Sequence, residues 1–556
     1  MSSPQRPAAS LSPAAAARAL PRAGLLASLA ASVILAAGWR RYAIAFFAGA
    51  LGALAMAPMS WTPAMILPMT AAVWLIDGAA PHAGARLGVL RSAFAAGWWM
   101  GFGYFLAGLW WVGVAFLVDA DQFAWALPLG VIALPAGLAL FWGMGFALAR
   151  FLWRPGPWRV FALAFGLGAL EWARGVVLTG FPWNEVGMAL GGNLALAQAA
   201  SLIGVNGLTF VSIAIFAAPA TLWRFSDDRF DPWPTLLAAG ALAVIAAFGA
   251  VRLSAPPSPV VPGVRLRLIQ PDISQGPEFS ARNKEAILAR YFELSDRDGP
   301  DGQARNVTHL IWPESAFPFL LARDAGALSE IVGFLRQGEI LVTGAARMEE
   351  DGDGAARYYN SLQVLDGSGL TGQRYDKRHL VPFGEYVPLQ RFLDWTGITQ
   401  FVHVPGGFTA GDGRRGLAIP GLPPAIPLIC YEAIFPEEPG ETARASRSAS
   451  WLLNVTDDAW FGVTPGPYQH YEQARLRAIE LGLPLVRDAN SGVSAVVDGL
   501  GREIAVAPLG VETVIDADLP EALPPTWQRR FGSLNALALA LLCLGASLAP
   551  MKRQKI

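Results

Sequence analysis

The chain has few charged residues for its length. Asp, Glu, Lys and Arg make up 15% of its 556 residues, whereas roughly 25% is usual in a soluble domain. The net charge is −1, so the sequence offers no basic surface of the kind that binds nucleic acid. Because 53% of the residues are apolar and long runs lack charge, the composition indicates a membrane protein.

Cysteine and histidine are also scarce. The two cysteines, Cys430 and Cys543, are too far apart for a zinc-finger spacing, and they cannot build a disulfide framework. The five histidines show no paired-ligand spacing. We therefore predict no metal site and no cofactor. The N-terminus is basic and then apolar, but a cleaved signal peptide is a poor interpretation because the apolar character continues to about residue 253.

The apolar runs predict membrane-spanning helices, each of which needs about 20 residues to cross the hydrocarbon core. The predicted spans are 43–60, 62–77, 92–118, 124–149, 159–178, 203–223, 234–253 and, after a long gap, 531–550. A further apolar segment, 23–39, has arginines on both sides, so charge cannot orient it. It is as readily an interfacial or re-entrant helix as another span.

The basic residues predict how these spans are oriented. The tail 551–556 holds three Lys or Arg residues, which places it in the cytoplasm. Counting back from the tail, the polar block 254–530 lies outside, and the loop 150–158 with its two arginines lies inside. The loop 119–123, which carries two aspartates, then lies outside.

The composition also predicts the domain organisation. We expect a basic N-terminal segment with one uncertain apolar helix (1–42), a bundle of seven spans (43–253), a Pro-rich linker (254–263), an extramembrane domain (264–528), a final span (531–550) and the tail (551–556). In the extramembrane domain, short strand-like runs such as "VRLRLIQPDI" and "SWLLNVTDD" alternate with helix-like stretches, and "VSAVVDGLGREIA" reads as a hairpin. This pattern predicts a layered α/β domain with a mixed sheet.

Four stretches of that domain place reactive side chains just after strand-like runs, where α/β folds tend to carry their sites. Glu314 lies in "LIWPESAFPF", and Lys377, His379 and Glu385 lie in "RYDKRHLVPFGEYVP". Taken alone, each of these groups is better explained as a solvated surface residue than as part of a site. The stretch "NVTDDAWFG" adds an aromatic and glycine-containing loop with Asn454, Asp457, Trp460 and Phe461.

Cys430 lies in the remaining stretch, "PAIPLICYEAIFPEE". A lone cysteine after an apolar run is most often a buried core residue, and this interpretation stays open for Cys430 on its own. Together with a carboxylate and a lysine, each after its own strand, the thiol would have a base and a cation, which a cysteine nucleophile needs. Cys543 lies in an apolar helix without a nearby acid or base, and we assign it no role.

The motifs "WPES", "YDKRHLVPFGEYVP" and "ICYE" in this order resemble the carbon–nitrogen hydrolase (nitrilase) superfamily. With "LTGFPWNEVG" and "DAWFG", the chain is similar to the apolipoprotein N-acyltransferase family of the bacterial inner membrane, from about residue 40 to residue 550. The resemblance implies a multi-span α-helical membrane bundle plus a periplasmic nitrilase-like α/β domain, which is an α-β-β-α sandwich.

The resemblance also implies the roles of individual residues. Glu314 matches the general base, Lys377 the catalytic lysine and Cys430 the nucleophile. The further residues expected to bind substrate or support the site are Glu385, Tyr431, Glu432, Asn360, Trp460 and Trp183. Two departures stand out, since the family usually has asparagine where this chain has Asp457 and often has Lys-Trp in place of Glu278-Phe279.

The implied activity is the final step of bacterial lipoprotein maturation. An acyl group would pass from a phospholipid to the thiol of Cys430 and then to the amino group of a diacylglyceryl-cysteine on an apolipoprotein. The resemblance implies a monomer in the lipid bilayer, with its catalytic domain in the periplasm. Two alternatives remain: a membrane-anchored nitrilase-type amidase, which would use water, and a transporter with an outer ligand-binding domain. The second predicts charges inside the spans, for which Glu171 and Arg174 are the clearest candidates.

Overall fold

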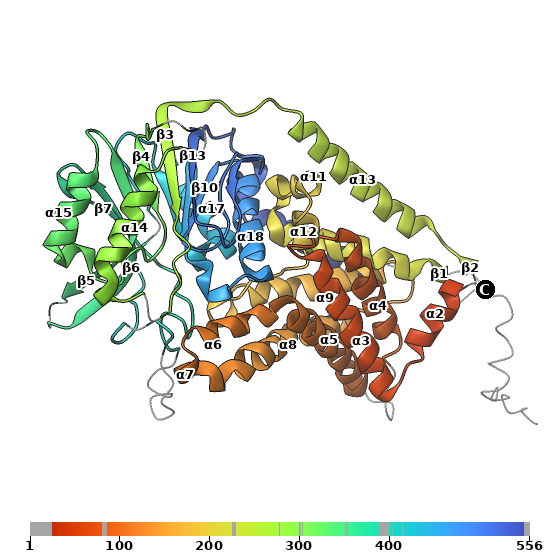
Figure 1. Cartoon of the computed structure of the whole chain (residues 1–556). Coiled ribbons are helices and arrows are strands. Elements are labelled where there is room, and N and C mark those ends of the chain that lie inside the picture. The colour runs from red at the N-terminus through yellow and green to blue at the C-terminus, as the bar shows by residue number, and fades with distance from the viewer. Residues whose placement is uncertain are drawn as a thin grey trace, which may run out of the picture.

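The computed structural model describes residues 25–79, 86–224, 229–276, 279–299, 302, 304–350, 352, 354–388, 400–402, 404–413, 415–446 and 448–549. The basic residues before residue 25, the expected cytoplasmic tail 551–556 and Glu278 lie outside the described residues. Helices form the N-terminal part of the chain and two sheets form most of the remainder (Figure 1).

The N-terminal part is a bundle of helices that are apolar on all sides, which is typical of helices buried in protein or lipid. Its longer helices are α2 (Leu25–Ile34), α3 (Gly38–Gly52), α4 (Ile66–Asp77), α5 (Arg86–Leu109), α8 (Leu134–Phe151), α9 (Arg159–Arg174), α12 (Ala200–Ala217) and α13 (Trp233–Leu253). Four short helices connect them: α6 (Ala115–Val118), α7 (Ala120–Phe123), α10 (Met188–Gly191) and α11 (Leu194–Ala197). The helix α20 (Leu534–Ser547) returns to the bundle from the end of the chain and packs on α9 and α12.

Among the described residues, four helical segments are long and apolar enough to cross a membrane: Arg86–Val118, Ala120–Phe151, Ala200–Thr221 and Trp233–Leu253. A fifth would be the pair Leu26–Ile34 and Gly38–Ala55, which is bent by 120°. This bend lies within the segment 23–39, whose orientation the sequence does not fix. The predicted total of seven spans and a final span is not tested by these lengths and stays a prediction.

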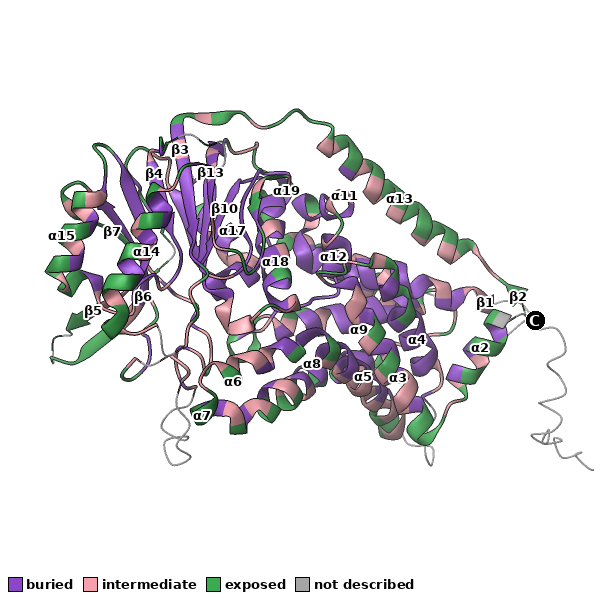
Figure 2. Cartoon of the chain, viewed as in Figure 1, coloured by how far each residue is buried: buried purple, intermediate pink, exposed green. Residues whose placement is uncertain are grey.

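Helix α13 runs along the outside of the molecule, where it contacts α11 and α12 (Figures 1 and 2). Its apolar side chains are largely exposed, with Leu237 and Val251 each 72% accessible and Val244 69%. A helix with this composition would leave an apolar surface in water, whereas hydrocarbon would cover it. The following chain leads into the first strand of the sheet domain.

The sheet domain contains two mixed sheets. The six-stranded sheet has the order β13-β3-β4-β5-β6-β7, in which β3, β4 and β5 are parallel and the other pairings are antiparallel. Its strands are β3 (Val260–Gln270), β4 (His309–Trp312), β5 (Ile340–Glu350), β6 (Ala356–Asp366), β7 (Gly369–Asp376) and β13 (Thr513–Pro520). Sequence patterning predicted most of these strands but not β7 and β13.

The five-stranded sheet has the order β12-β11-β10-β9-β8, with β8, β9 and β10 parallel. Its strands are β8 (Ala425–Ile429), β9 (Trp451–Thr456), β10 (Leu485–Ala489), β11 (Ser494–Val497) and β12 (Glu503–Ala507). The predicted hairpin is confirmed, because β11 and β12 pair antiparallel.

The two sheets pack face to face and are covered by helices on their outer faces. Side chains such as Leu268 and Val342 from one sheet meet Leu453 and Val486 from the other in a common core. The six-stranded sheet is covered by α14 (Lys284–Asp296) and α15 (Ala325–Phe334), and the five-stranded sheet by α17 (Glu437–Ala445) and α18 (Pro465–Leu481). The predicted α-β-β-α sandwich is therefore confirmed.

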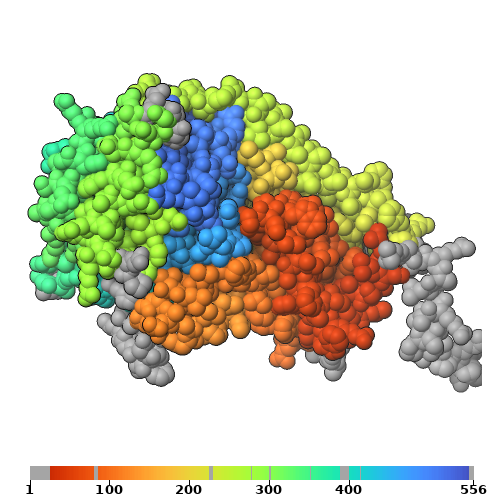
Figure 3. Space-filling model, viewed as in Figure 1, coloured from red at the N-terminus to blue at the C-terminus, as the bar shows by residue number. Residues whose placement is uncertain are grey.

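The sandwich and the bundle share a hydrophobic core. Tyr431, Phe435 and Ile479 of the sheet domain pack among the buried residues of the helices. Figure 3 shows the C-terminal part of the sheet domain (blue) directly against the N-terminal helices (red to orange). The short helix α19 (Trp527–Phe531) lies between the domain and the final helix and contacts α12.

Gly344 generates a prediction about the turn after β4. A Cβ on Gly344 would lie 2.5 Å from the carbonyl oxygen of Pro313 and 2.6 Å from Cα of Glu314, and overpacking of this kind costs about 1–3 kcal/mol. We expect Gly344→Ala to lower the melting temperature of the detergent-solubilised protein, followed by tryptophan fluorescence. Gly333 in α15 has open space around it, so Gly333→Ala is the matched control, and equal melting temperatures for the two variants would contradict the prediction.

Candidate active site

The candidate residues lie where several strands end at one edge of the sandwich. Glu314 follows β4, Lys377 follows β7 and Cys430 follows β8. Strand β7 runs in the direction of β4, because two antiparallel pairings separate it from β5. All three side chains therefore reach the same edge and line one cavity.

Glu314, Lys377, Glu385 and Asn360 form one buried cluster. The Lys377 ammonium donates to Glu314 Oε1 and to Glu385 Oε1, each at 3.1 Å. Asn360 Nδ2 donates to the same two oxygens, at 2.7 and 2.9 Å. Each of these four side chains is at most 6% accessible, so the two carboxylates and the amine attract each other with little screening by water.

Two backbone groups hold the carboxylates of this cluster in place. Glu314 Oε2 accepts the backbone N–H of Asp457 at 3.0 Å, and Glu385 Oε2 accepts that of Val381 at 2.8 Å. Burial by itself would lower the pKa of Lys377, but the charges of Glu314 and Glu385 outweigh it and hold the pKa above its usual value. Lys377 is therefore charged, and one of its three N–H groups remains for a ligand in the cavity.

Cys430 has an unusual backbone conformation and a neutral thiol. Its φ of +49° lies in the left-handed region, which a residue other than glycine occupies only where the surroundings enforce it. Burial and the charge of Glu314 raise the pKa of the thiol well above its usual value, and Lys377 opposes this only in part. A reaction at the sulfur would therefore need a base to take the thiol proton.

Tyr431 and Glu432 support the turn that carries Cys430. Glu432 accepts the backbone N–H groups of Ile429 at 2.7 Å and Arg378 at 2.8 Å and the hydroxyl of Tyr375 at 2.8 Å. Burial raises the pKa of Glu432 to about 7 in spite of these hydrogen bonds. The hydroxyl of Tyr431 donates to the carbonyl of Gly180 at 2.9 Å, which ties the turn to the bundle.

The cavity at this edge has a volume of about 1200 Å³ and walls from both parts of the chain. Its polar end holds the cluster and Cys430, and the rest is largely apolar and aromatic. Both tryptophans expected from sequence, Trp183 and Trp460, line it, as does Phe279. The helices contribute, among others, Phe116, Trp125, Leu129, Leu134 and Met144.

Trp183 lies in a hydrogen-bonded contact between the bundle and α18. Its indole N–H donates to Gln469 Oε1 at 2.9 Å, and the indole of Trp111 donates to the same oxygen at 3.2 Å. The loop that carries Trp183 is held by Arg174, which also pairs with Glu171 at 2.9 Å. Glu171 and Arg174 thus serve this loop as a fully buried ion pair, and they do not form a charged path through the bundle.

Asp457 takes the place of the asparagine expected from the family. It is 3% accessible, its Oδ1 accepts the N–H groups of Asn490 at 3.0 Å and Ala459 at 3.1 Å, and its Oδ2 has no partner among the described residues. Burial raises the pKa of Asp457 to about 8. At neutral pH its carboxyl group is therefore largely protonated and, like an amide, uncharged.

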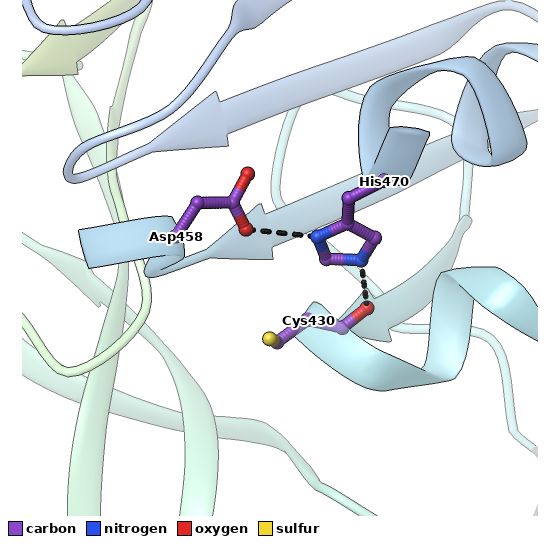
Figure 4. A group of neighbouring side chains, drawn as sticks. All are labelled: Cys430, Asp458 and His470. Carbon is purple, nitrogen blue, oxygen red and sulfur yellow. Dashed lines mark hydrogen bonds and ion pairs between the residues drawn. The ribbon is translucent and has the colours of Figure 1, made fainter. Parts of the chain in front are cut away.

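Sequence reasoning missed a second buried network behind Cys430 (Figure 4). Nδ1 of His470 lies 2.8 Å from Asp458 Oδ1, and Nε2 lies 3.1 Å from the carbonyl oxygen of Cys430. Arg487 donates to Asp458 Oδ2 at 2.7 Å. Ligand atoms of Cys430, Asp458 and His470 lie within 4.8 Å of one another, but these hydrogen bonds already occupy the imidazole and the carboxylate, which does not fit a metal site.

Two of the missed residues, His470 and Arg487, carry no local signal in the sequence. Asp458 is the first residue of the motif "DAWFG", but the motif does not show that it pairs with them, because the three residues come from three separate elements. The five histidines show no paired-ligand spacing in the sequence, so nothing there singles out His470. Gln469 and His470 are neighbours on α18, and the spacing to Asp458 becomes meaningful only when the turn after β9 is placed beside that helix.

Comparisons with known proteins agree with this architecture. Residues 48–218 match the apolipoprotein N-acyltransferase N-terminal domain, and residues 275–527 match carbon-nitrogen hydrolase. An apolipoprotein N-acyltransferase of Rhodopseudomonas palustris is 49% identical over 94% of this chain and 97% of its own length. Proteins of the same name from Bradyrhizobium diazoefficiens and Brucella suis are 49% and 42% identical, over 93% and 94% of this chain and 96% and 98% of their own lengths.

The raised pKa of Asp457 predicts a pH-dependent stability. The folded protein holds this proton up to about pH 8, whereas the unfolded chain releases it near pH 4. As the pH rises between these values, the free energy of unfolding of the wild type should therefore fall relative to that of Asp457→Asn by about 1.4 kcal/mol per pH unit. Melting temperatures of both proteins from pH 5 to pH 9 measure this difference.

Asp458→Asn is the matched control for Asp457→Asn. Burial would raise the pKa of Asp458, but the charges of Arg487 and His470 outweigh it and hold the pKa below its usual value. Asp458→Asn should therefore be less stable than the wild type at neutral pH, and its stability relative to the wild type should not increase as the pH rises. A constant difference between wild type and Asp457→Asn across pH 5–9 would refute the assignment of Asp457.

Proposed function

The chain belongs to the apolipoprotein N-acyltransferase family, and from this premise we propose that it is an acyltransferase that N-acylates the terminal diacylglyceryl-cysteine of apolipoproteins. The acyl donor is a membrane phospholipid, and the acyl group is carried as a thioester on Cys430. The enzyme works in the bilayer as a monomer and completes lipoprotein maturation.

The observation that carries this proposal is the cavity. Its polar end has a thiol, a carboxylate and an ammonium group, and its walls are apolar side chains of the membrane helices and of the sheet domain. A volume of about 1200 Å³ exceeds the usual range of small-molecule sites, which is about 300–1000 Å³. An apolar chamber that joins a helix bundle to a nucleophile fits a lipid acyl chain.

In the first half-reaction, the sulfur of Cys430 attacks the ester carbonyl of the phospholipid, and Glu314 takes the thiol proton. The carbonyl oxygen becomes negative and is held by the free N–H of Lys377 and the backbone N–H of Tyr431. Such donors are worth about 3–4 kcal/mol each when one is lost. The C–O bond then breaks, and the lysophospholipid leaves with the proton from Glu314.

In the second half-reaction, the free amino group of the diacylglyceryl-cysteine attacks the thioester. Glu314 accepts a proton from the amine, the C–S bond breaks, and the Cys430 sulfur regains the proton. The products are the amide of the mature lipoprotein and the free enzyme. Glu314 thus acts twice as a base, which its two hydrogen-bond donors and the neighbouring Lys377 support.

The distribution of Lys and Arg supports an orientation with the catalytic domain in the periplasm. The predicted inner loop 150–158 lies beside the end of the final helix, since Arg154 donates to the carbonyl of Leu548 at 2.7 Å. The loop 178–187 and the catalytic residues lie together at the cavity. We therefore propose that both lipid substrates enter from the outer leaflet of the inner membrane.

Acylation of the enzyme by phospholipid tests the first half-reaction. Incubation of the detergent-purified protein with a phospholipid labelled in its acyl chain should give a protein-bound label that hydroxylamine removes. Cys430→Ala should form none, and Glu314→Gln should form it at least about 100-fold more slowly, as expected when a general base is lost. Cys543→Ala is the control and should be labelled like wild type. A hydroxylamine-labile label that survives in Cys430→Ala would refute the scheme.

Discharge of the labelled enzyme separates the transferase from the amidase alternative. A diacylated lipopeptide with a free N-terminal amine should remove the label and become labelled itself. The same lipopeptide with an acetylated N-terminus is the control and should leave the label on the protein. If buffer alone discharges the enzyme as fast as the free amine does, water is the second nucleophile and a membrane-anchored amidase is favoured.

A further inference from the structure

His470 lies between the carboxylate of Asp458 and the backbone of Cys430. We propose that His470, fixed by Asp458 and Arg487, holds the peptide plane between Cys430 and Tyr431 through its Nε2–H and thereby aims the Tyr431 N–H at the oxyanion. His470 would be a positioning residue, because it touches the nucleophile's backbone and no reacting atom. This inference rests on the proposed role of Cys430 and Tyr431.

The first step concerns the ring nitrogen that faces Cys430. Nε2 of His470 lies 3.1 Å from the carbonyl oxygen of Cys430, which can only accept, so Nε2–H is the donor of this hydrogen bond. The other nitrogen, Nδ1, lies 2.8 Å from Asp458 Oδ1 and 3.2 Å from Nη2 of Arg487. These two contacts fix the plane of the ring and therefore the direction of the Nε2–H.

The second step concerns the charges around the ring. Asp458 is fully buried and also receives Arg487 at Oδ2 and the hydroxyl of Thr456 at Oδ1, at 2.7 and 2.9 Å. Among the described residues, the titratable or charged groups against the imidazole are thus Asp458, Arg487 and the thiol of Cys430, and the rings of Trp183 and Phe461 pack on it with ring centroids 5.4 and 6.1 Å away. These groups and rings hold the imidazole in one orientation behind the proposed nucleophile.

The third step concerns the peptide unit that His470 holds. In a planar trans peptide the C=O and the following N–H point in opposite directions. A bond from His470 to the carbonyl of Cys430 therefore turns the N–H of Tyr431 away from His470. That N–H belongs to the second residue of the short helix Cys430–Ile434, where backbone N–H groups have no partner within the helix.

The fourth step concerns the conformation of Cys430. Its φ of +49° is sparsely populated for cysteine, so something must hold it. His470 bonds to the carbonyl oxygen of Cys430 itself. Glu432 accepts the N–H of Ile429, the residue before Cys430. Loss of the His470 bond would release the peptide plane while leaving the sulfur in its pocket.

The test compares two reactions of the same thiol. Acylation by phospholipid builds an oxyanion, whereas alkylation by iodoacetamide does not. In His470→Phe, which keeps an aromatic ring but no donor, we expect the acylation rate of Cys430 to fall about 100-fold or more, the usual effect of losing one oxyanion donor. Alkylation, measured in a Cys543→Ala background, should change by much less than tenfold.

Two further variants make the test decisive. His470→Gln keeps one N–H donor for the carbonyl and should recover about tenfold of the lost acylation rate. His309→Phe is the control, because His309 is also buried and bonded to a carbonyl, that of Pro420 at 2.8 Å, but lies at the far end of β4. If His470→Phe does not fold, His470→Gln against wild type decides: acylation must fall more than alkylation.

A spectroscopic measurement checks the hydrogen bond directly and does not depend on acylation. In nanodiscs, protein labelled with [¹⁵N]histidine should show an Nε2–H signal protected from exchange with solvent that disappears in His470→Gln. The lack of such a signal from His470, equal losses of acylation and alkylation, or unchanged acylation would each overturn the inference. If wild type is alkylated but never acylated, the proposed function fails, and the spectrum still decides whether His470 holds the carbonyl of Cys430.

Discussion

Burial of one lysine between two glutamates is the constraint on which the site depends. Lys377 is 1% accessible and would be costly to bury alone, so Glu314 and Glu385 must lie within hydrogen-bond reach of it. These three residues come from the ends of separate strands and loops, and the cluster therefore forms only when the sandwich is complete. Burial and the charge of Glu314 both raise the pKa of the nearby Cys430 thiol. In the proposed mechanism Glu314 accepts the thiol proton, which leaves Lys377 with one carboxylate and able to stabilise a new negative charge in the cavity.

Helix α18 connects the same site to the bundle. Two adjacent residues of this helix, Gln469 and His470, have different partners. Gln469 accepts the indole N–H groups of Trp111 and Trp183, and His470 contacts the carbonyl of Cys430. The cavity wall supplied by the helices and the backbone of the proposed nucleophile are thus fixed by adjacent residues of one helix. In the proposed mechanism, this connection keeps a lipid that binds against the helices in a fixed position relative to the sulfur of Cys430.

Much of the architecture could be predicted from sequence because it depends on local patterns. The strand that ends at Cys430 follows from its apolar run and the hairpin of β11 and β12 from its pattern, and the set of motifs around Glu314, Lys377 and Cys430 identified the layers of the fold. Strands β7, β10 and β13 were missed because they carry charged residues, such as Arg374, Arg487 and Asp516. The contacts of Asn360 with two carboxylates, and the network of His470, Asp458 and Arg487, depend on distances between segments that no periodicity encodes. The neutral state of Asp457 likewise follows from the burial of its side chain, which the sequence alone does not show.

The burial of the reactive groups also bears on the choice between an amine and water as the second nucleophile. Cys430 and Glu314 are 9% and 6% accessible, and the cavity leading to them is lined mainly by apolar side chains. An acyl chain that remains attached to Cys430 would fill much of this space and exclude water from the thioester. An amine that is tethered to its own lipid chains can be delivered through the same apolar walls, because burial of each CH₂ group contributes about 0.8 kcal/mol to its binding. Water gains nothing comparable from these walls, so a cavity of this kind favours transfer to a lipid-anchored amine over hydrolysis.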